Sequence, residues 1–144
     1  MAQPLDAADW TTIQEAFQRH ILLVFRDQRI AEEDLLGFAR RFGPLERFVD
    51  RSYQDARNPE VSRLTNLDET GQPFGPCPKM EKMSLAENWH TDSSYRAVPA
   101  LATLLHGLEV PAVGGGTSFL SGYRAYEVLP EALPPAHRDL VGFA

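Results

Sequence analysis

The chain has 144 residues, 43% of them hydrophobic and 24% charged, a composition typical of one globular domain rather than of a disordered chain. Acidic residues number 20 against 14 basic ones, and the formal net charge of -6 excludes a broad basic face for nucleic acid or anionic lipid. The single cysteine, Cys77, excludes an internal disulfide and a zinc site built from several cysteines.

No segment predicts export or membrane insertion. The apolar run from Ile21 to Phe25 is far shorter than the ~20 residues of a membrane span. The first residues, Met1 to Asp9, lack the basic and apolar regions of a signal peptide. We therefore expect a cytoplasmic protein that has neither nucleic acid nor a membrane as partner.

A helix followed by a strand is predicted near the N-terminus. The helix begins at Asp6 or Asp9, both good N-caps, and ends at His20. Its apolar face repeats at i, i+3 and i+7, in Trp10, Ile13 and Phe17. The run from Ile21 to Phe25 is short, β-rich and continuously apolar, so we expect a strand that is buried on both faces.

A second helix is predicted from about Ala31 to Phe42. Acidic residues fill its first turn and arginines its last, an order that suits the helix macrodipole. The pair Gly43-Pro44 is a typical stop signal. The apolar stripe of this helix consists of Leu35, Phe38, Ala39 and Phe42.

The rest of the chain is predicted to alternate between strands and turns, without an internal domain boundary. Strands are expected over 61–66, 88–95, 100–108 and 117–120, and turns over 68–71 and 111–116. The segment 72–84 is rich in proline and has the composition of a loop that covers a site. A last helix is expected after Ser121 and ends at Pro134-Pro135.

The stretch Trp89-His90-Thr91-Asp92 carries the candidate chemistry. On an extended backbone, residues i and i+2 point to the same side, so His90 and Asp92 would present an imidazole and a carboxylate to one point. These are two of the three ligands of the 2-His-1-carboxylate triad that holds non-haem Fe(II). The spacing alone has a simpler interpretation, a surface ion pair on a strand.

Five segments together resemble the taurine/2,4-dichlorophenoxyacetate dioxygenase family, the TauD/TfdA group of Fe(II)/2-oxoglutarate enzymes. The similarity is distributed over most of the chain. Its parts are Leu23–Gln28, Phe38–Leu45, Trp89–Tyr95, Val110–Thr117 and Ala125–Leu129. The run Asp92–Pro99 leans toward the aryloxyalkanoate branch of the family rather than the taurine branch.

The resemblance implies a mixed α and β fold, in which residues 1–144 form the N-terminal portion of a double-stranded β-helix, a jelly-roll-like fold with flanking helices. It implies an enzyme that uses Fe(II), 2-oxoglutarate and O2 to hydroxylate a small organic substrate bearing a carboxylate or a sulfonate. His90 and Asp92 would be metal ligands, and Thr117 would hydrogen-bond a carboxylate of 2-oxoglutarate. Asn66 lies where the family places polar residues near the substrate, and is either substrate-binding or a turn residue.

Two departures from the family pattern matter. Gly116 stands where the family usually has Asp, so the hydrogen bonding of that turn is expected to differ. The family's distal His ligand and the Arg that binds 2-oxoglutarate are expected beyond the chain given, and His137 is a poor substitute for that ligand. About five predicted strands, against ~8 in a jelly roll, would leave apolar faces exposed, so we expect self-association.

Three functions stay open on the sequence: a dioxygenase, a non-catalytic truncated remnant that acts by association, and a cupin-like binding module without redox chemistry. A downstream His and Arg would favour the first, and ligand binding without any metal requirement would favour the third.

Lys79, Lys82 and Arg96 either attract a substrate carboxylate or form a solvated face.

Overall fold

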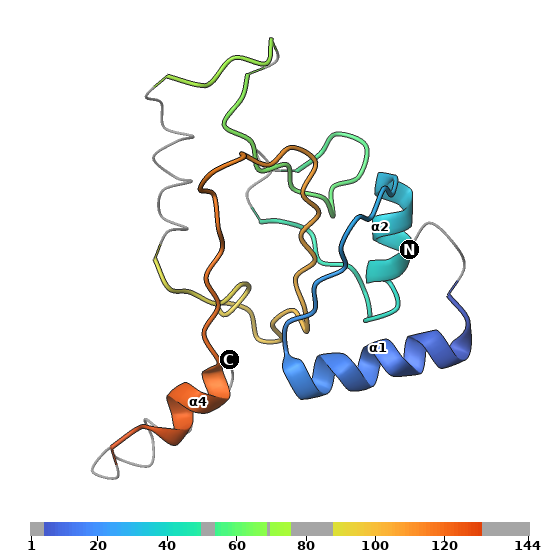
Figure 1. Cartoon of the computed structure of the whole chain (residues 1–144), viewed down its shortest axis with the longest axis vertical. Coiled ribbons are helices and arrows are strands. Elements are labelled where there is room, and N and C mark those ends of the chain that lie inside the picture. Colours follow the sequence, from blue (N-terminus) through green and yellow to red (C-terminus); the bar gives the residue numbers. More distant parts are fainter. Residues whose placement is uncertain (1–4, 50–53, 69, 76–87, 131–144) are drawn as a thin grey trace. The chain divides into compact units, whose positions relative to one another are not determined.

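The computed structural model describes residues 5–49, 54–68, 70–75 and 88–130 (Figure 1). The chain groups into two compact units: unit 1 comprises Met1–Arg41 with Leu104–Ala144, and unit 2 comprises Phe42–Thr103. In the described ranges the helices are α1, α2 and α4, and all three belong to unit 1. The predictions made for Cys77, Lys79, Lys82, Pro134-Pro135 and His137 lie outside the described residues.

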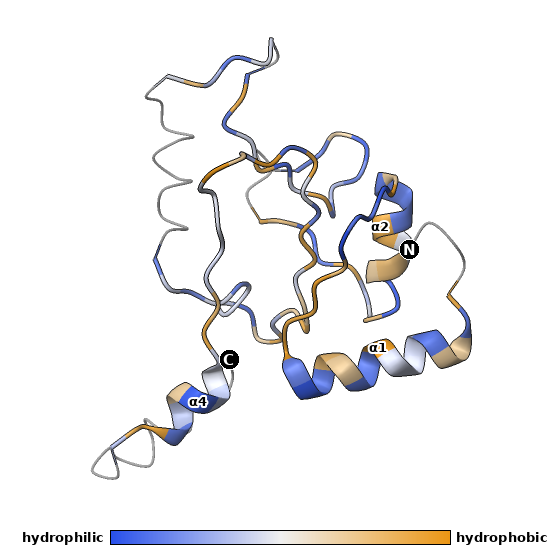
Figure 2. Cartoon of the chain, in the orientation of Figure 1, coloured by the Kyte–Doolittle hydropathy of each residue, from blue (hydrophilic) through white to orange (hydrophobic). Residues whose placement is uncertain are grey.

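Helix α1 spans Ala7–His20, as predicted. The Asp6 carboxylate is its N-cap and accepts a hydrogen bond from the N–H of Asp9 at 2.8 Å, which decides between the two predicted caps. The expected face is confirmed, because Trp10, Ile13 and Phe17 are its half-buried large side chains. Hydrophobic and hydrophilic positions accordingly alternate along α1 in Figure 2.

Helix α2 spans Glu32–Ala39 and ends before the predicted Phe42. The Asp34 carboxylate accepts a hydrogen bond from the N–H of Ala31 at 2.9 Å and so satisfies a donor at the helix start. At the other end the N–H of Arg41 bonds the carbonyl of Phe38 at 3.1 Å, a tighter turn that closes the helix. Phe38 of the predicted stripe is buried, together with Leu36, which was not predicted.

The core of unit 1 is an aromatic cluster of Trp10, Phe25 and Phe38. The Phe38 ring makes edge-on contacts with both other rings, at centroid distances of 6.0 Å to Trp10 and 5.7 Å to Phe25. The Arg41 guanidinium lies 5.3 Å from the Trp10 ring centroid and donates to the carbonyl of Leu5 at 2.9 Å. The cluster therefore joins α1, α2 and the segment between them.

Strand predictions fare differently from helix predictions. Over the described residues the strand pairing is limited to isolated bridges, Gln54–Ser62 and Leu67–Pro73, without an extended β-ladder. The run from Ile21 to Phe25 is not buried on both faces, and Val24 is 69% exposed, because no described strand pairs with it. The strand predicted over 88–95 is wrong for Asp92–Tyr95, which form a turn. The jelly-roll fold stays a prediction.

The two predicted turns are confirmed, and the last predicted helix begins after Ser121 as expected but ends at Glu127, short of the predicted Pro134-Pro135. The Asp68 carboxylate accepts hydrogen bonds from the N–H and hydroxyl of Thr70 and from the N–H of Gln72, and Gly71 has a φ of +78°. The second turn contains Gly114 and Gly115, also with positive φ. Helix α4 follows over Gly122–Glu127, capped by Ser121. No helix in the described ranges is both long and apolar enough to span a membrane.

Candidate functional site

His90 and Asp92 lie together in unit 2. The Nε2 atom of His90 is 3.5 Å from the Oδ1 atom of Asp92, and the two side chains are 51% and 54% exposed. They converge as the motif predicted. Residues 89–91 lie in no described strand ladder, and a turn begins at Asp92.

A hydrogen bond decides which nitrogen of His90 is available to a ligand. The Nδ1 atom lies 2.7 Å from the backbone carbonyl oxygen of Asn88. Because a carbonyl only accepts, Nδ1 carries the proton, and in the neutral ring Nε2 keeps its lone pair. That lone pair faces a carboxylate oxygen, an arrangement that a proton or a cation between the two atoms stabilises. A histidine that binds metal through Nε2 has this same bond to a carbonyl behind it.

The other oxygen of Asp92 is held by Thr103. The Thr103 hydroxyl donates to Oδ2 at 2.8 Å, so the carboxylate is oriented with Oδ1 toward His90. The sequence reasoning missed Thr103, which lies 11 residues from Asp92 inside a predicted strand. A lone threonine in a strand carries no signal of such a role, and only the tertiary contact reveals it.

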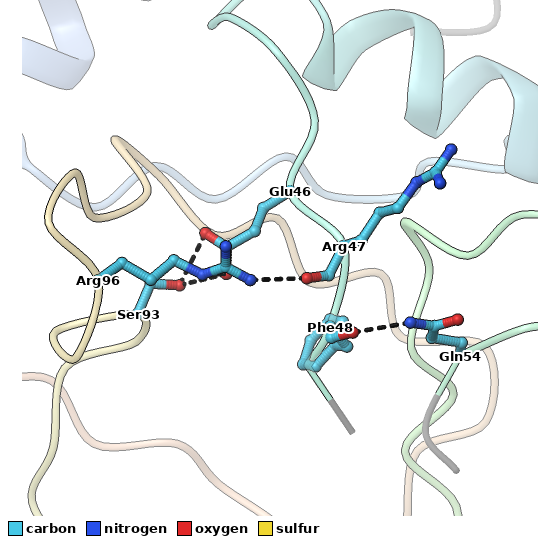
Figure 3. Close-up of polar contacts among 6 residues, drawn as sticks. All are labelled: Glu46, Arg47, Phe48, Gln54, Ser93 and Arg96. Atoms are coloured by element: carbon cyan, nitrogen blue, oxygen red, sulfur yellow. Dashed lines mark hydrogen bonds and ion pairs between the residues drawn. The ribbon is translucent and has the colours of Figure 1, made fainter. Parts of the chain in front are cut away.

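The turn that follows Asp92 is fastened by three residues, which we call the Glu46 clamp: Glu46, Ser93 and Arg96 (Figure 3). The Ser93 hydroxyl lies 2.8 and 2.9 Å from the two carboxylate oxygens of Glu46. The Nε atom of Arg96 lies 2.7 Å from Oε1 of Glu46, an ion-pair contact rather than a directed hydrogen bond. Arg96 also donates from Nη2 to the carbonyl of Arg47 at 2.8 Å. Arg96 therefore pairs with a carboxylate of this chain, that of Glu46.

The donor set fits part of a divalent-cation site. An imidazole nitrogen and a carboxylate oxygen suit Fe(II) among other first-row metals. Two donors bound at ~2.1 Å to adjacent positions of one ion are ~3 Å apart, near the 3.5 Å separation of Nε2 and Oδ1. Among the described residues no cluster of three or more His, Cys, Asp or Glu side chains forms a candidate metal site. His90 and Asp92 therefore supply two donors.

The other two predicted site residues are less informative. Thr117 is exposed in unit 1, on an extended segment between the glycine turn and α4. Asn66 belongs to unit 2, and its carbonyl accepts a hydrogen bond from the N–H of Phe74 at 2.8 Å while its side chain is exposed. That backbone bond lies beside the antiparallel bridge between Leu67 and Pro73, and both alternatives for Asn66 stay predictions. The predicted role of Thr117 toward 2-oxoglutarate stays a prediction.

The chain matches the family described as "Taurine catabolism dioxygenase TauD, TfdA family" over residues 1–141, and it belongs to that family. It is 34% identical to an (S)-phenoxypropionate/alpha-ketoglutarate-dioxygenase of Sphingobium herbicidovorans and 36% identical to a pentalenolactone F synthase of Streptomyces avermitilis, each over 90% of this chain and 42% of the relative. Identity is 28% to an alpha-ketoglutarate-dependent 2,4-dichlorophenoxyacetate dioxygenase of Cupriavidus pinatubonensis, over 92% of this chain and 48% of that protein.

The chain thus spans less than half the length of each of these three relatives. No solved structure matches it significantly. The family assignment confirms the resemblance that the five sequence segments indicated.

Proposed function

We propose that this chain contributes part of the active site of an Fe(II)/2-oxoglutarate-dependent dioxygenase. His90, through Nε2, and Asp92, through Oδ1, would hold the iron. Thr117 would hydrogen-bond a carboxylate of 2-oxoglutarate. Iron and 2-oxoglutarate, when bound, supply the activation of O2 and the oxidation of an organic substrate. The observation that carries the proposal is the facing of Nε2 and Oδ1 at 3.5 Å in a chain of this family.

The chain's own residues would act on the metal through hydrogen bonds. The Asn88 carbonyl holds the proton of His90 on Nδ1, which keeps Nε2 free to donate its lone pair. The Thr103 hydroxyl takes up one lone pair of Asp92 on Oδ2, which leaves Oδ1 for the cation. Both bonds reduce the freedom that the two ligands would lose on binding, so they favour affinity.

For the substrate we propose a small organic molecule with a carboxylate or sulfonate group, and within that class an aryloxyalkanoate. Two of the relatives above are named for phenoxypropionate and 2,4-dichlorophenoxyacetate, which are both aryloxyalkanoates. Within the chain, the run Asp92–Pro99 is the segment that leans toward the same branch. Residues that contact the substrate stay a prediction, as does a cytoplasmic location.

A Co(II) titration of the 144-residue chain tests the metal pair, because Co(II) accepts the same donors as Fe(II) and is stable in air. We expect weak binding that is lost in His90→Ala and in Asp92→Ala. The matched control is His106→Ala, since His106 also lies near a carbonyl, that of Gln28, at 3.4 Å. Equal binding by the wild type, His90→Ala and His106→Ala would contradict the proposal.

Self-association is a second candidate function, favoured by the exposure of large apolar side chains. Val24, Val110, Val113 and Val128 are each at least 69% exposed, and Leu36 and Phe38 are the buried apolar residues of the described ranges. Extensive exposed apolar surface in a soluble protein marks a surface that binds another. We propose that copies of this chain associate, and light scattering at two concentrations tests it. A monomer that melts sharply at both concentrations would contradict it.

A further inference from the structure

We propose that Glu46 and Arg96 are positioning residues, which set the geometry of the His90–Asp92 pair by clamping the turn that follows Asp92. The inference rests on the proposed role of that pair as metal ligands. It concerns residues that touch neither His90 nor Asp92 directly. Their effect passes through the backbone of Ser93, the next residue after Asp92.

The backbone of Ser93 needs support from outside the turn. Its φ is +59°, in the left-handed region that residues with a Cβ rarely occupy. The N–H of Arg96 bonds the carbonyl of Ser93 at 2.9 Å and closes the turn, but that bond does not restrict the turn to one orientation. If Ser93 relaxed to a negative φ, the chain direction at Asp92 would change. Asp92 would then lose its approach to His90 and its bond from Thr103.

The Glu46 clamp supplies that support from a distant part of the sequence. Ser93 lies 47 residues from Glu46, and the two are joined side chain to side chain. The carboxylate of Glu46 binds Ser93 and Arg96 at once, so it fastens the second and the fifth residue of the segment Asp92–Arg96. Figure 3 shows both side chains directed at the same carboxylate.

Arg96 is better shielded from water than the arginines of the described Arg47–Glu60 and Arg63–Asp55 pairs, although their carboxylates, 19% and 14% exposed, are more buried than Glu46. The side chains of Arg96 and Glu46 are 33% and 28% exposed, whereas the arginines of the Arg47–Glu60 and Arg63–Asp55 pairs are 69% and 59% exposed. The Nε atom of Arg96 contacts the Glu46 carboxylate, and its Nη2 atom donates to the carbonyl of Arg47. Both groups of the guanidinium therefore already have partners within this chain. Positioning is therefore a better assignment for Arg96 than direct capture of a substrate carboxylate.

The test compares Co(II) affinity among variants of the 144-residue chain. Removing a partner that orients a ligand typically weakens metal binding about 10-fold or more, so we expect ~10-fold weaker binding for Glu46→Gln and for Arg96→Gln. The double variant should be no weaker than the weaker single variant, because both act through the same turn. Arg63→Gln is the matched control, since it breaks an Arg–carboxylate pair of 2.8 Å in the same unit, and its affinity should stay within ~2-fold.

Two further measurements separate positioning from loss of folding and from failure of the metal site. The conservative variant Arg96→Lys keeps a cation opposite Glu46 and leaves the contact between Ser93 and Glu46 intact, so it should keep Co(II) affinity to within ~3-fold of wild type, with the same ligand-field absorption spectrum. If His90→Ala binds Co(II) as the wild type does, the proposed metal pair itself fails. If His90→Ala loses binding while Glu46→Gln and Arg96→Gln bind like Arg63→Gln, the positioning inference is overturned.

Discussion

The described parts of the two units are stabilised by opposite kinds of contact. In unit 1 the helices α1 and α2 meet at the rings of Trp10, Phe25 and Phe38. In unit 2 the described ranges contain no helix, and charged contacts connect their loops: Glu46 to Arg96, Arg47 to Glu60, and Asp55 to Arg63. Apolar contacts contain no group that titrates or that salt can screen, whereas contacts between charges depend on pH and weaken as salt screens them.

This difference bears on function, because the candidate metal pair belongs to the polar unit. Exposed ion pairs contribute only ~0–1 kcal/mol each to the free energy of unfolding. Geometry in unit 2 therefore depends on many small, directional contacts, and single substitutions should alter binding more than stability. In unit 1 single substitutions should alter stability more than binding, because one aromatic ring contributes to several contacts.

The largest effect is expected in the aromatic cluster. Phe38→Ala removes a side chain that is 6% exposed and contacts both other rings, so we expect the free energy of unfolding to fall by about 3 kcal/mol. Urea unfolding followed by circular dichroism measures it. Tyr123→Ala is the matched control in the same unit, because Tyr123 is 70% exposed, and should change stability by less than ~0.5 kcal/mol. Equal losses would show that the cluster is not the core of unit 1.

A smaller effect is expected in the glycine turn of unit 1. Gly115 has a φ of +68°, and a Cβ there would lie 2.8 Å from Cγ of Pro111. Gly115→Ala should therefore destabilise the chain by about 1–2 kcal/mol. Gly116→Ala is the control, because no atom lies within 4 Å of a Cβ at that position. Urea unfolding that gives both variants the same stability would contradict this account of the turn.

In the polar unit the expected change is in binding. Thr103→Val keeps the shape of the side chain but removes the hydroxyl that donates to Asp92. A hydrogen bond to a charged carboxylate is worth ~1.5–3 kcal/mol, so Co(II) affinity measured by titration should fall about 10-fold or more. Thr12→Val removes a hydroxyl that bonds the Ala8 carbonyl inside α1 and should leave Co(II) affinity unchanged. A Thr103→Val variant that binds Co(II) like wild type would remove Thr103 from the site.

The smallest effect is the response of unit 2 to acid. Hydrogen bonds from the Thr70 hydroxyl, and next from the Gln72 N–H, lower the pKa of Asp68 below its ordinary value of 3.8. The N–H of Arg57, and next the Arg63 guanidinium, lower the pKa of Asp55. A carboxyl whose pKa is lowered by folding stabilises the fold above pH ~4, and this contribution is lost as the pH falls through the lower, folded-state value.

Amide resonances followed by NMR check that response. The N–H signals of Thr70 and Asn58 should move as the pH is lowered below ~4, while the indole N–H of Trp10 in the aromatic cluster should not. Asp68→Asn should abolish the change at Thr70 and leave that at Asn58 intact. Simultaneous movement of all three signals would mean that acid unfolds the two units together, and the contrast between them would be lost.

The sequence by itself determined the helices, the turns and the candidate metal pair. Helix α1 begins at one of its two predicted caps, and α4 begins after Ser121 as predicted, because an N-cap side chain bonds an N–H only three residues away. The turn at Asp68 is equally local. His90 and Asp92 were found because metal ligands two residues apart form a recognisable pattern, although the turn that begins at Asp92 was not predicted.

Tertiary structure decided what those local patterns could not contain. The burial of Leu36 beside Phe38, the bond from Thr103 to Asp92 and the Glu46 clamp are contacts whose partners no local periodicity identifies. The turn at Ser93 is the clearest case. Its left-handed backbone contradicts the preference of a serine, and it is compensated by Glu46, 47 residues earlier in the chain. A strand was predicted over 88–95 because local preference was the only information available there, and a distant carboxylate outweighs it.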